Sequence, residues 1–164
     1  MVNKLNLINE KVLKICQSVA VALTFLIIIS TSVQVFTRYV LGASLIGTEE
    51  VARYSFIWAN MLGASICVSR FSHATISFLP DNLKGKSKTF QECFVQAMIM
   101  IMAIILITQG YNMILVTLKQ LSPTLNIPMW MIYLSIPVGG ATMLLGSLCN
   151  MLNIFSKKDD GGEQ

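Results

Sequence analysis

Four long stretches without a charged side chain limit what this chain can fold into. They cover residues 15–37, 54–69, 93–118 and 120–156. A helix needs about 20 apolar residues to cross a bilayer, because each residue adds about 1.5 Å to its length. Charged residues make up 12% of the 164 residues, whereas soluble domains carry roughly 25%. The sequence therefore predicts an all-α integral membrane protein with four transmembrane helices.

The predicted helices leave little chain for any other domain. We place them at about 15–41, 49–70, 90–118 and 128–155, within a single domain of residues 1–164. Residues 1–14 and 71–79 carry apolar side chains at helical spacing, which is typical of amphipathic segments on a membrane surface. The first apolar stretch is too long for a cleavable signal peptide and has no small-residue cleavage site. Residues 156–164 form a polar tail in this prediction.

Basic residues are distributed unequally over the two sides that this topology defines. The termini and the loop near residue 80 would share nine of them, and the opposite side would carry three, which are Arg38, Arg53 and Lys119. Loops rich in Lys and Arg stay in the cytoplasm, so we expect both termini to be cytoplasmic. The basic residues are scattered and lack interleaved aromatic side chains, so nothing indicates binding to nucleic acid.

Charged residues border the second apolar stretch. Arg38 follows the first stretch, and Glu49, Glu50 and Arg53 precede the second. Charges beside hydrocarbon are costly and usually have a paired or positional role. We predict that Arg38 pairs with Glu49 or Glu50 near the external surface and fixes the first helix against the second. A simpler alternative is that these side chains only mark helix ends.

Local helix geometry accounts for part of this arrangement. Thr48 can cap the second helix, and the two glutamates that follow it then lie at the positive end of the helix dipole. Glu49 and Arg53 are four positions apart, in the order that favours an ion pair. We expect Arg70 and His73 at the opposite, cytoplasmic end of this helix. The predicted cluster, with a structural or partner-interface role, is Arg38, Glu49, Glu50, Arg53, Arg70 and His73.

The fourth apolar stretch carries small residues on one helix face. These are Ser135, Gly139, Thr142 and Gly146, at positions i, i+4, i+7 and i+11. Gly63 lies on a similar face of the second helix. Small side chains let another helix approach closely in a membrane, so we predict that all these residues are helix-packing positions. Pro137 should bend the fourth helix.

Groups needed for catalysis or ion transport are absent from the predicted spans. No Asp, Glu, Lys, Arg or His lies in their middle, although ion pathways usually need such groups. The single histidine argues against a haem anchor, and the four cysteines lack a metal-ligand spacing such as Cys-x-x-Cys. We therefore expect no catalytic residue, cofactor, metal site or enzyme activity. A helical partner subunit fits best, and the alternatives are an autonomous small transporter acting as a homo-oligomer or a non-haem membrane anchor subunit.

Six short motifs follow one another along the chain. They are Phe36-x-Arg38-Tyr39-Val40, Glu49-Glu50-Val51-Ala52-Arg53, Gly63-Ala64, Arg70-x-x-His73, Pro128-x-Trp130 and Tyr133-x-x-Ile136-Pro137-Val138-Gly139. In this order and spacing the chain resembles the small membrane subunit of TRAP (tripartite ATP-independent periplasmic) transporters, the DctQ/SiaQ family. The resemblance covers about residues 10–156. The chain departs from many members just before the Glu-Glu pair, where it has Ile46-Gly47-Thr48 in place of an aromatic residue.

The resemblance implies a role in a larger transporter of the bacterial inner membrane. Such subunits work with a large membrane subunit of the DctM/SiaM type, which carries the substrate and sodium sites. A periplasmic substrate-binding protein of the DctP/SiaP type delivers an organic acid, such as a dicarboxylate or sialic acid. By this resemblance, the chain is expected to act among the membrane lipids as a scaffold for the large subunit and to help receive the binding protein.

Overall fold

The computed structural model describes residues 2–42, 46–70 and 86–160. Its helices are α1 (Val2–Val40), α2 (Ile46–Arg70), α3 (Lys86–Thr117), α4 (Trp130–Tyr133) and α5 (Ser135–Asp160). Four stretches are long and apolar enough to cross a membrane, namely Leu5–Val40, Gly47–Arg70, Gln91–Thr117 and Trp130–Ile154. The predicted all-α fold with four spanning helices is confirmed. The predicted surface segment at 71–79, which includes His73, lies outside the described residues.

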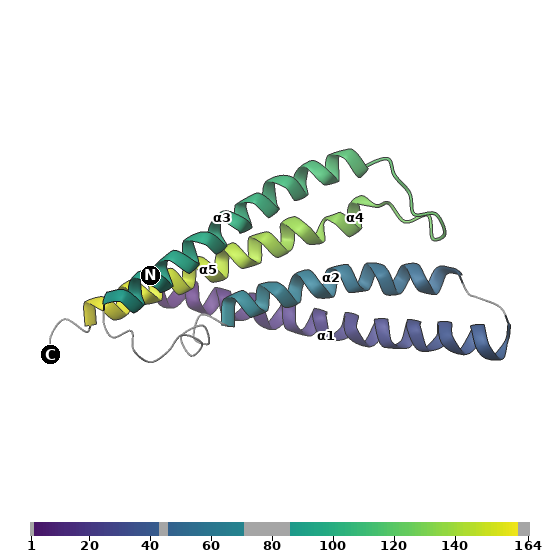
Figure 1. Ribbon diagram of the computed structural model, residues 1–164, viewed down its shortest axis with the longest axis horizontal. Helices are drawn as coiled ribbons and strands as arrows, with labels where there is room; N and C mark the ends of the chain where they lie inside the picture. Colours follow the sequence, from purple (N-terminus) through teal and green to yellow (C-terminus); the bar gives the residue numbers. More distant parts are fainter. Residues whose placement is uncertain (1, 43–45, 71–85, 161–164) are drawn as a thin grey trace.

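The helices form two antiparallel pairs that diverge from one end of the molecule. The first helix, α1, packs along α2, whereas α3 packs along α5, and contacts between α2 and α5 join the two pairs. The pairs lie close together near both termini and spread apart at the other end (Figure 1). The end of α1, the start of α2 and the α3–α4 loop all lie at that far end. The side of the membrane that each end faces stays a prediction.

The first helix is longer than the predicted span. No Gly or Pro occurs between Val2 and Val40, so nothing in the backbone separates the predicted surface segment at 1–14 from the apolar stretch. The N-terminal part of α1 contacts the C-terminal half of α5, where the Asn6 amide donates a hydrogen bond to Asn153 Oδ1 at 3.0 Å. The helix stops before Gly42, whose φ of +65° is in the left-handed region that glycine adopts easily.

The fourth span consists of two helices that meet at Leu134. α4 ends at Tyr133 and α5 begins at Ser135. Pro137 lies in the first turn of α5, and a proline ring disfavours a regular helix around the residue four positions earlier. The break at Leu134 therefore lies within one helical turn of Pro137, where the predicted bend is expected.

Close contacts between backbones hold α5 in the middle of the bundle. A Cβ atom on Gly139 would lie 3.2 Å from Met61 Cβ of α2, and a Cβ atom on the adjacent Gly140 would lie 3.1 Å from the Ala103 carbonyl oxygen of α3. The two glycines thus face two different neighbours. Near the start of α5, the helix α3 also approaches closely. A Cβ atom on Gly110 of α3 would lie 2.7 Å from Pro137 Cδ of α5. Small residues let membrane helices pack at such distances.

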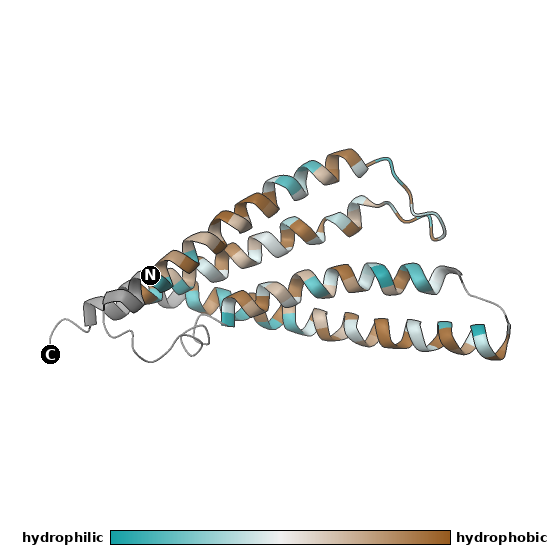
Figure 2. Ribbon diagram, viewed as in Figure 1, coloured by the Kyte–Doolittle hydropathy of each residue, from teal (hydrophilic) through white to brown (hydrophobic). Residues whose placement is uncertain are grey.

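The outer surface is not equally apolar along all helices. Figure 2 shows dense apolar colouring along α3 and several hydrophilic turns along α2. The mean hydropathy over an 18-residue window of each span agrees, with 2.3 within Leu5–Val40, 2.1 within Gln91–Thr117, 1.6 within Trp130–Ile154 and 1.2 within Gly47–Arg70. The second helix is therefore the least apolar of the four spans.

Candidate functional site

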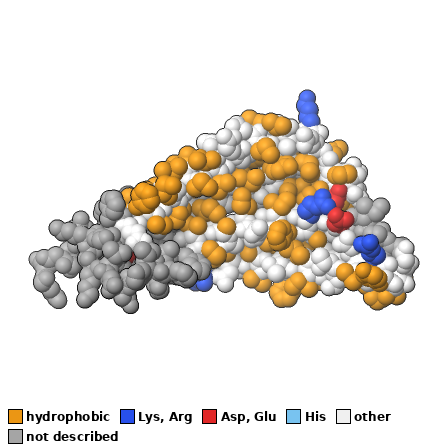
Figure 3. All heavy atoms as spheres, viewed as in Figure 1, with side chains coloured by type: hydrophobic (Ala, Val, Ile, Leu, Met, Phe, Trp, Pro, Cys, Tyr) orange, Lys and Arg blue, Asp and Glu red, His pale blue; other side chains and the backbone are white. Residues whose placement is uncertain are grey.

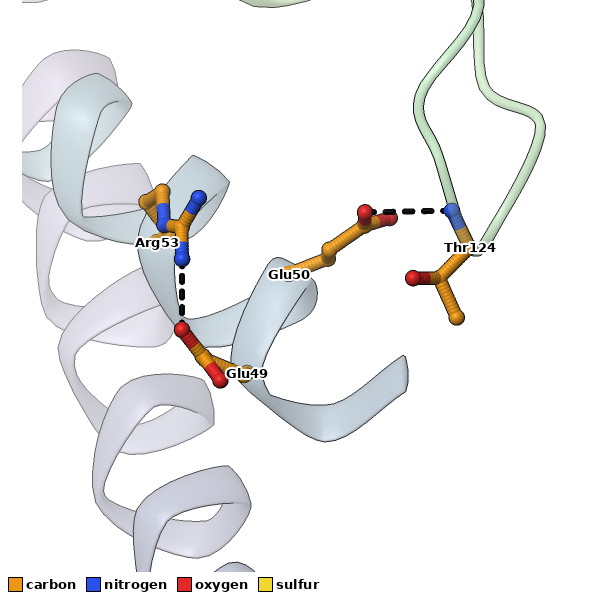
Figure 4. A network of polar contacts seen from close by, with 4 residues as sticks. All are labelled: Glu49, Glu50, Arg53 and Thr124. Atoms are coloured by element: carbon orange, nitrogen blue, oxygen red, sulfur yellow. Dashed lines mark hydrogen bonds and ion pairs between the residues drawn. The ribbon is translucent and has the colours of Figure 1, made fainter. Parts of the chain in front are cut away.

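The start of α2 places one acidic side chain inside the protein. Glu50 is only 6% exposed, and its carboxylate faces the α3–α4 loop (Figure 4). It accepts hydrogen bonds from the backbone N–H groups of Thr124 and Leu125, both at 3.1 Å. It also accepts one from the Ser122 hydroxyl. A carboxylate can only accept hydrogen bonds, so three converging donors satisfy it without a basic partner.

The loop that supplies these donors has a defined turn. Its two ends are held together by the Ser122 N–H bond to the Ile127 oxygen at 2.9 Å and the Met129 N–H bond to the Gln120 oxygen at 2.9 Å. Asn126 adopts a φ of 53°, and Asn tolerates this left-handed conformation better than most residues. The turn directs the successive backbone N–H groups of Thr124 and Leu125 towards α2, where the Glu50 carboxylate accepts both.

Two aromatic side chains extend the same contact along α2. The Tyr54 hydroxyl lies 3.8 Å from Met129 Sδ, and Trp58 Nε1 donates to the Met131 carbonyl oxygen at 3.2 Å. Together with Glu50, these residues stand at positions i, i+4 and i+8 and therefore share one face of the helix. Our sequence reasoning missed this face. The signal was the regular spacing of three residues that can form polar contacts, immediately after a helix start.

The other glutamate lies outside the bundle. Glu49 Oε1 forms an ion pair with Arg53 Nη2 at 2.5 Å, and the two side chains are 58% and 61% exposed. This is the i, i+4 pair that the sequence favours, and Figure 4 shows it on the side of α2 away from the loop. An exposed pair of this kind contributes about 0–1 kcal/mol to stability.

The predicted pairing of Arg38 with Glu49 or Glu50 is not formed. Among the residues that the structure describes, the Glu49–Arg53 contact is the one ion pair within 4.0 Å. Glu50 cannot reach Arg38, because it turns into the bundle towards the loop. Arg38 is instead an exposed residue in the last turn of α1, where a cation complements the negative end of the helix dipole.

The remaining predicted residues are spread over the bundle. At the other end of α2, Arg70 donates to Gln17 Oε1 of α1 at 2.9 Å. Ser135 is almost fully buried and bonds the Ile132 oxygen at 2.8 Å. Thr142 bonds the oxygens of its own helix. Gly63 differs from the other predicted packing positions, because a Cβ atom on it would meet nothing within 4 Å.

Three other close contacts lie at the α5 interfaces, and two of them are hydrogen bonds. Ser147 donates to Gln96 Oε1 of α3 at 2.7 Å. Gly146 lies against α2, where an added Cβ atom would be 2.9 Å from Ser69 Cβ. Asn150 donates to the Ser69 oxygen at 3.4 Å. These groups bond within the bundle, as side chains of membrane helices commonly do. In the described part of the chain, no three His, Cys, Asp or Glu residues come together in a way that could hold a metal ion.

Comparison with known proteins identifies the family. Residues 27–157 match the model of the DctQ family, described as "Tripartite ATP-independent periplasmic transporters, DctQ component". The chain is 29% identical over 129 residues to the sialic acid TRAP transporter small permease protein SiaQ of Vibrio cholerae, which covers 74% of this chain and 70% of the relative. It is 29% identical over 104 residues to the C4-dicarboxylate TRAP transporter small permease protein DctQ of Rhodobacter capsulatus, which covers 62% of this chain and 46% of the relative.

A third relative is a much longer protein. The isethionate TRAP transporter permease protein DctMQ of Oleidesulfovibrio alaskensis is 27% identical over 123 residues, which are 72% of this chain but only 19% of the relative. The family match covers most of the chain and includes all four spanning helices in whole or in part. The chain therefore belongs to the DctQ family of TRAP transporter components, and it is a multi-pass inner-membrane permease subunit and not an enzyme.

Proposed function

We propose that this chain is the small subunit of a sodium-coupled, binding-protein-dependent TRAP transporter for organic acids. In this role it is a static scaffold for a large membrane subunit, and it contributes to the surface on which a periplasmic substrate-binding protein docks. The observation that carries the proposal is the family match combined with spans whose middles carry no ionisable side chain. Transport pathways for ions and acids usually need such side chains, so the large subunit would supply them.

The longer relative supports a large membrane partner. Its name joins DctM to DctQ, and the part that resembles this chain is only 19% of its length. One polypeptide therefore combines a segment like this chain with a much larger one. In the present protein we assign the larger part to a separate subunit.

The far end of the bundle has the properties expected of a docking surface. In the turn that hydrogen-bonds to Glu50, the side chains of Leu121 and Leu125 are exposed. Lys119, just before this turn, is exposed as well. Hydrogen bonds from three residues of the loop to one carboxylate restrict its movement, and a pre-ordered surface loses less entropy on binding. The excess of basic residues at the opposite end supports a periplasmic position for this loop.

The substrate class follows from the relatives and not from this chain. Their names include sialic acid, a C4-dicarboxylate and isethionate, all of which are organic acids. The selecting residues would lie in the binding protein and the large subunit.

Transport by purified components tests this proposal. Liposomes that contain only this chain should take up no organic acid under a sodium gradient. Uptake should begin when the cognate large subunit and binding protein are added, and it should stop when the sodium gradient is removed. Uptake by this chain alone would contradict the proposal and favour an autonomous transporter that works as a homo-oligomer.

A further inference from the structure

We propose that the large membrane subunit packs against the outer face of α2, which is formed by Glu49, Arg53, Phe56, Asn60, Gly63 and Cys67. This inference rests on the proposed function and adds the surface that performs it. The residues follow one another at alternating spacings of four and three, which is the repeat of a helix that packs along a second helix. In the chain alone all of them are exposed except Gly63, which is half-buried. The face lies opposite Leu62, Ser65 and Ser69, which are buried in the bundle.

The second helix is poorly suited to lipid. Over an 18-residue window its mean hydropathy is 1.2, the lowest value among the four spans, yet only 17% of that window is buried. The corresponding window of the fourth span, with a mean hydropathy of 1.6, is 44% buried. A span with polar residues is normally covered by protein, because lipid cannot satisfy polar groups. The residues that the structure describes leave α2 largely uncovered, so we assign its cover to another protein.

The outer faces of α1 and α3 have the opposite character. Their exposed side chains include Phe25, Ile28 and Ile29 on α1, and Ile101, Ile104 and Ile105 on α3. Such large aliphatic and aromatic side chains match hydrocarbon. Figure 3 shows apolar side chains dense over the upper pair of helices, with an acidic and a basic side chain in contact nearer the far end. The exposed faces of α1 and α3 are therefore suited to contact with lipid, whereas the more polar outer face of α2 is suited to contact with protein.

Asn60 indicates that the missing neighbour is a protein. Its carboxamide lies near the middle of Gly47–Arg70, is exposed and forms no hydrogen bond with any described residue. A carboxamide with no partner in hydrocarbon is costly. Asn side chains that hydrogen-bond to a neighbouring helix are a common means of association in membranes.

Gly63 supports a close approach by another helix at the same place. The glycines of α3 and α5 that lie against neighbouring helices each have atoms of those helices within about 3 Å of an added Cβ. On Gly63 the added Cβ would meet nothing within 4 Å. Glycine weakens a helix, so its presence here has no explanation within the chain. A second backbone packed against this position would explain it.

The longer relative favours the large subunit over a second copy of this chain. In DctMQ the matching segment is 19% of a single polypeptide, so the remaining 81% of that polypeptide is covalently attached to it. In that relative the larger part is therefore always present beside this segment, which favours it as the neighbour of an uncovered surface.

Photo-cross-linking tests the surface in the assembled complex. p-Benzoylphenylalanine is placed at Asn60, at Ile28 or at Ile105, and each variant is co-expressed with the cognate large subunit. We expect Asn60→p-benzoylphenylalanine to cross-link to the large subunit and the two control positions to give no such product. Cross-links to the large subunit from Ile28 or Ile105, but not from Asn60, would overturn this surface and leave the proposed function intact. Cross-links between two small subunits from Asn60 would also overturn it.

A substitution provides the second arm of the test. Gly63→Leu should abolish co-purification with the large subunit and leave the thermal stability of this chain alone at or above that of the wild type, because a Cβ atom at this position meets nothing within 4 Å and leucine favours a helix more than glycine does. Ile105→Leu on α3 is the matched control and should retain the complex. Full retention of the complex by Gly63→Leu would overturn the proposal. If the wild-type chain does not co-purify with the large subunit, the proposed function itself fails.

Discussion

The carboxylate of Glu50 accepts the backbone N–H of Leu125 at 3.1 Å, across 75 residues of sequence. This bond joins the N-terminal part of α2 to the α3–α4 loop, at the end where the two helix pairs diverge. The helices are far apart there, so the loop and the start of α2 bridge the gap. We therefore expect the stability of the far end to depend on Glu50 more than on any exposed charge.

Removal of Glu50 should destabilise the chain far more than removal of its neighbour. Glu50→Ala leaves the donors of Ser122, Thr124 and Leu125 without their acceptor, and a buried unsatisfied group costs about 1–3 kcal/mol. Glu49→Ala removes an exposed ion pair and should cost about 0–1 kcal/mol. Thermal unfolding of the two variants in the same detergent measures the difference. Equal losses would show that the loop does not depend on Glu50.

Ser122 and Glu50 should show coupled effects. Ser122→Ala removes one of three donors to the carboxylate, and a typical hydrogen bond contributes about 0.5–1.5 kcal/mol to stability. Once Glu50 has been replaced by Ala, the same serine substitution should cost much less. A double-mutant cycle on the free energy of unfolding measures this interaction. Strict additivity of the two changes would contradict the hydrogen bond.

Features that depend on neighbouring residues could be predicted from the sequence. The four spans follow from composition and length, and the Glu49–Arg53 pair follows from its i, i+4 spacing. The interruption near Pro137 follows from proline geometry. In each case the residues that decide the outcome lie within a few positions of one another or within one apolar stretch.

Features that depend on loop conformation could not be predicted. The partners of Glu50 are donors in a turn that contains Asn126 in a left-handed conformation, and nothing in the spacing of the sequence indicates this turn. Proximity in sequence suggested Arg38 as the partner, but the Glu50 carboxylate accepts hydrogen bonds from the α3–α4 loop instead. The glycines show a similar limit, since sequence alone cannot tell that Gly140 faces α3 while Gly63 faces open space.

The orientation of the chain can be tested with single cysteines. In a variant with Cys16, Cys67, Cys93 and Cys149 replaced by serine, Thr124→Cys should react with a membrane-impermeant maleimide in intact cells with a permeabilised outer membrane. Glu10→Cys should react only after the inner membrane is broken. Both positions are exposed in the chain, so accessibility within the protein does not limit the reaction. The reverse pattern would place the termini outside and contradict the orientation inferred from the basic residues.

Two glycines of this bundle should respond in opposite ways to the same substitution. Gly110→Ala places a Cβ atom 2.7 Å from Pro137 Cδ and 3.0 Å from Pro137 N, and the rigid ring and backbone cannot move aside. Such overpacking typically costs about 1–3 kcal/mol. Gly63→Ala adds the same atom where nothing lies within 4 Å, so only the higher helix propensity of alanine acts, up to about 1 kcal/mol in its favour. Thermal unfolding of the isolated chain should therefore rank Gly63→Ala at or above the wild type and Gly110→Ala below it. A loss of stability in Gly63→Ala would mean that this face of α2 is already occupied within the chain.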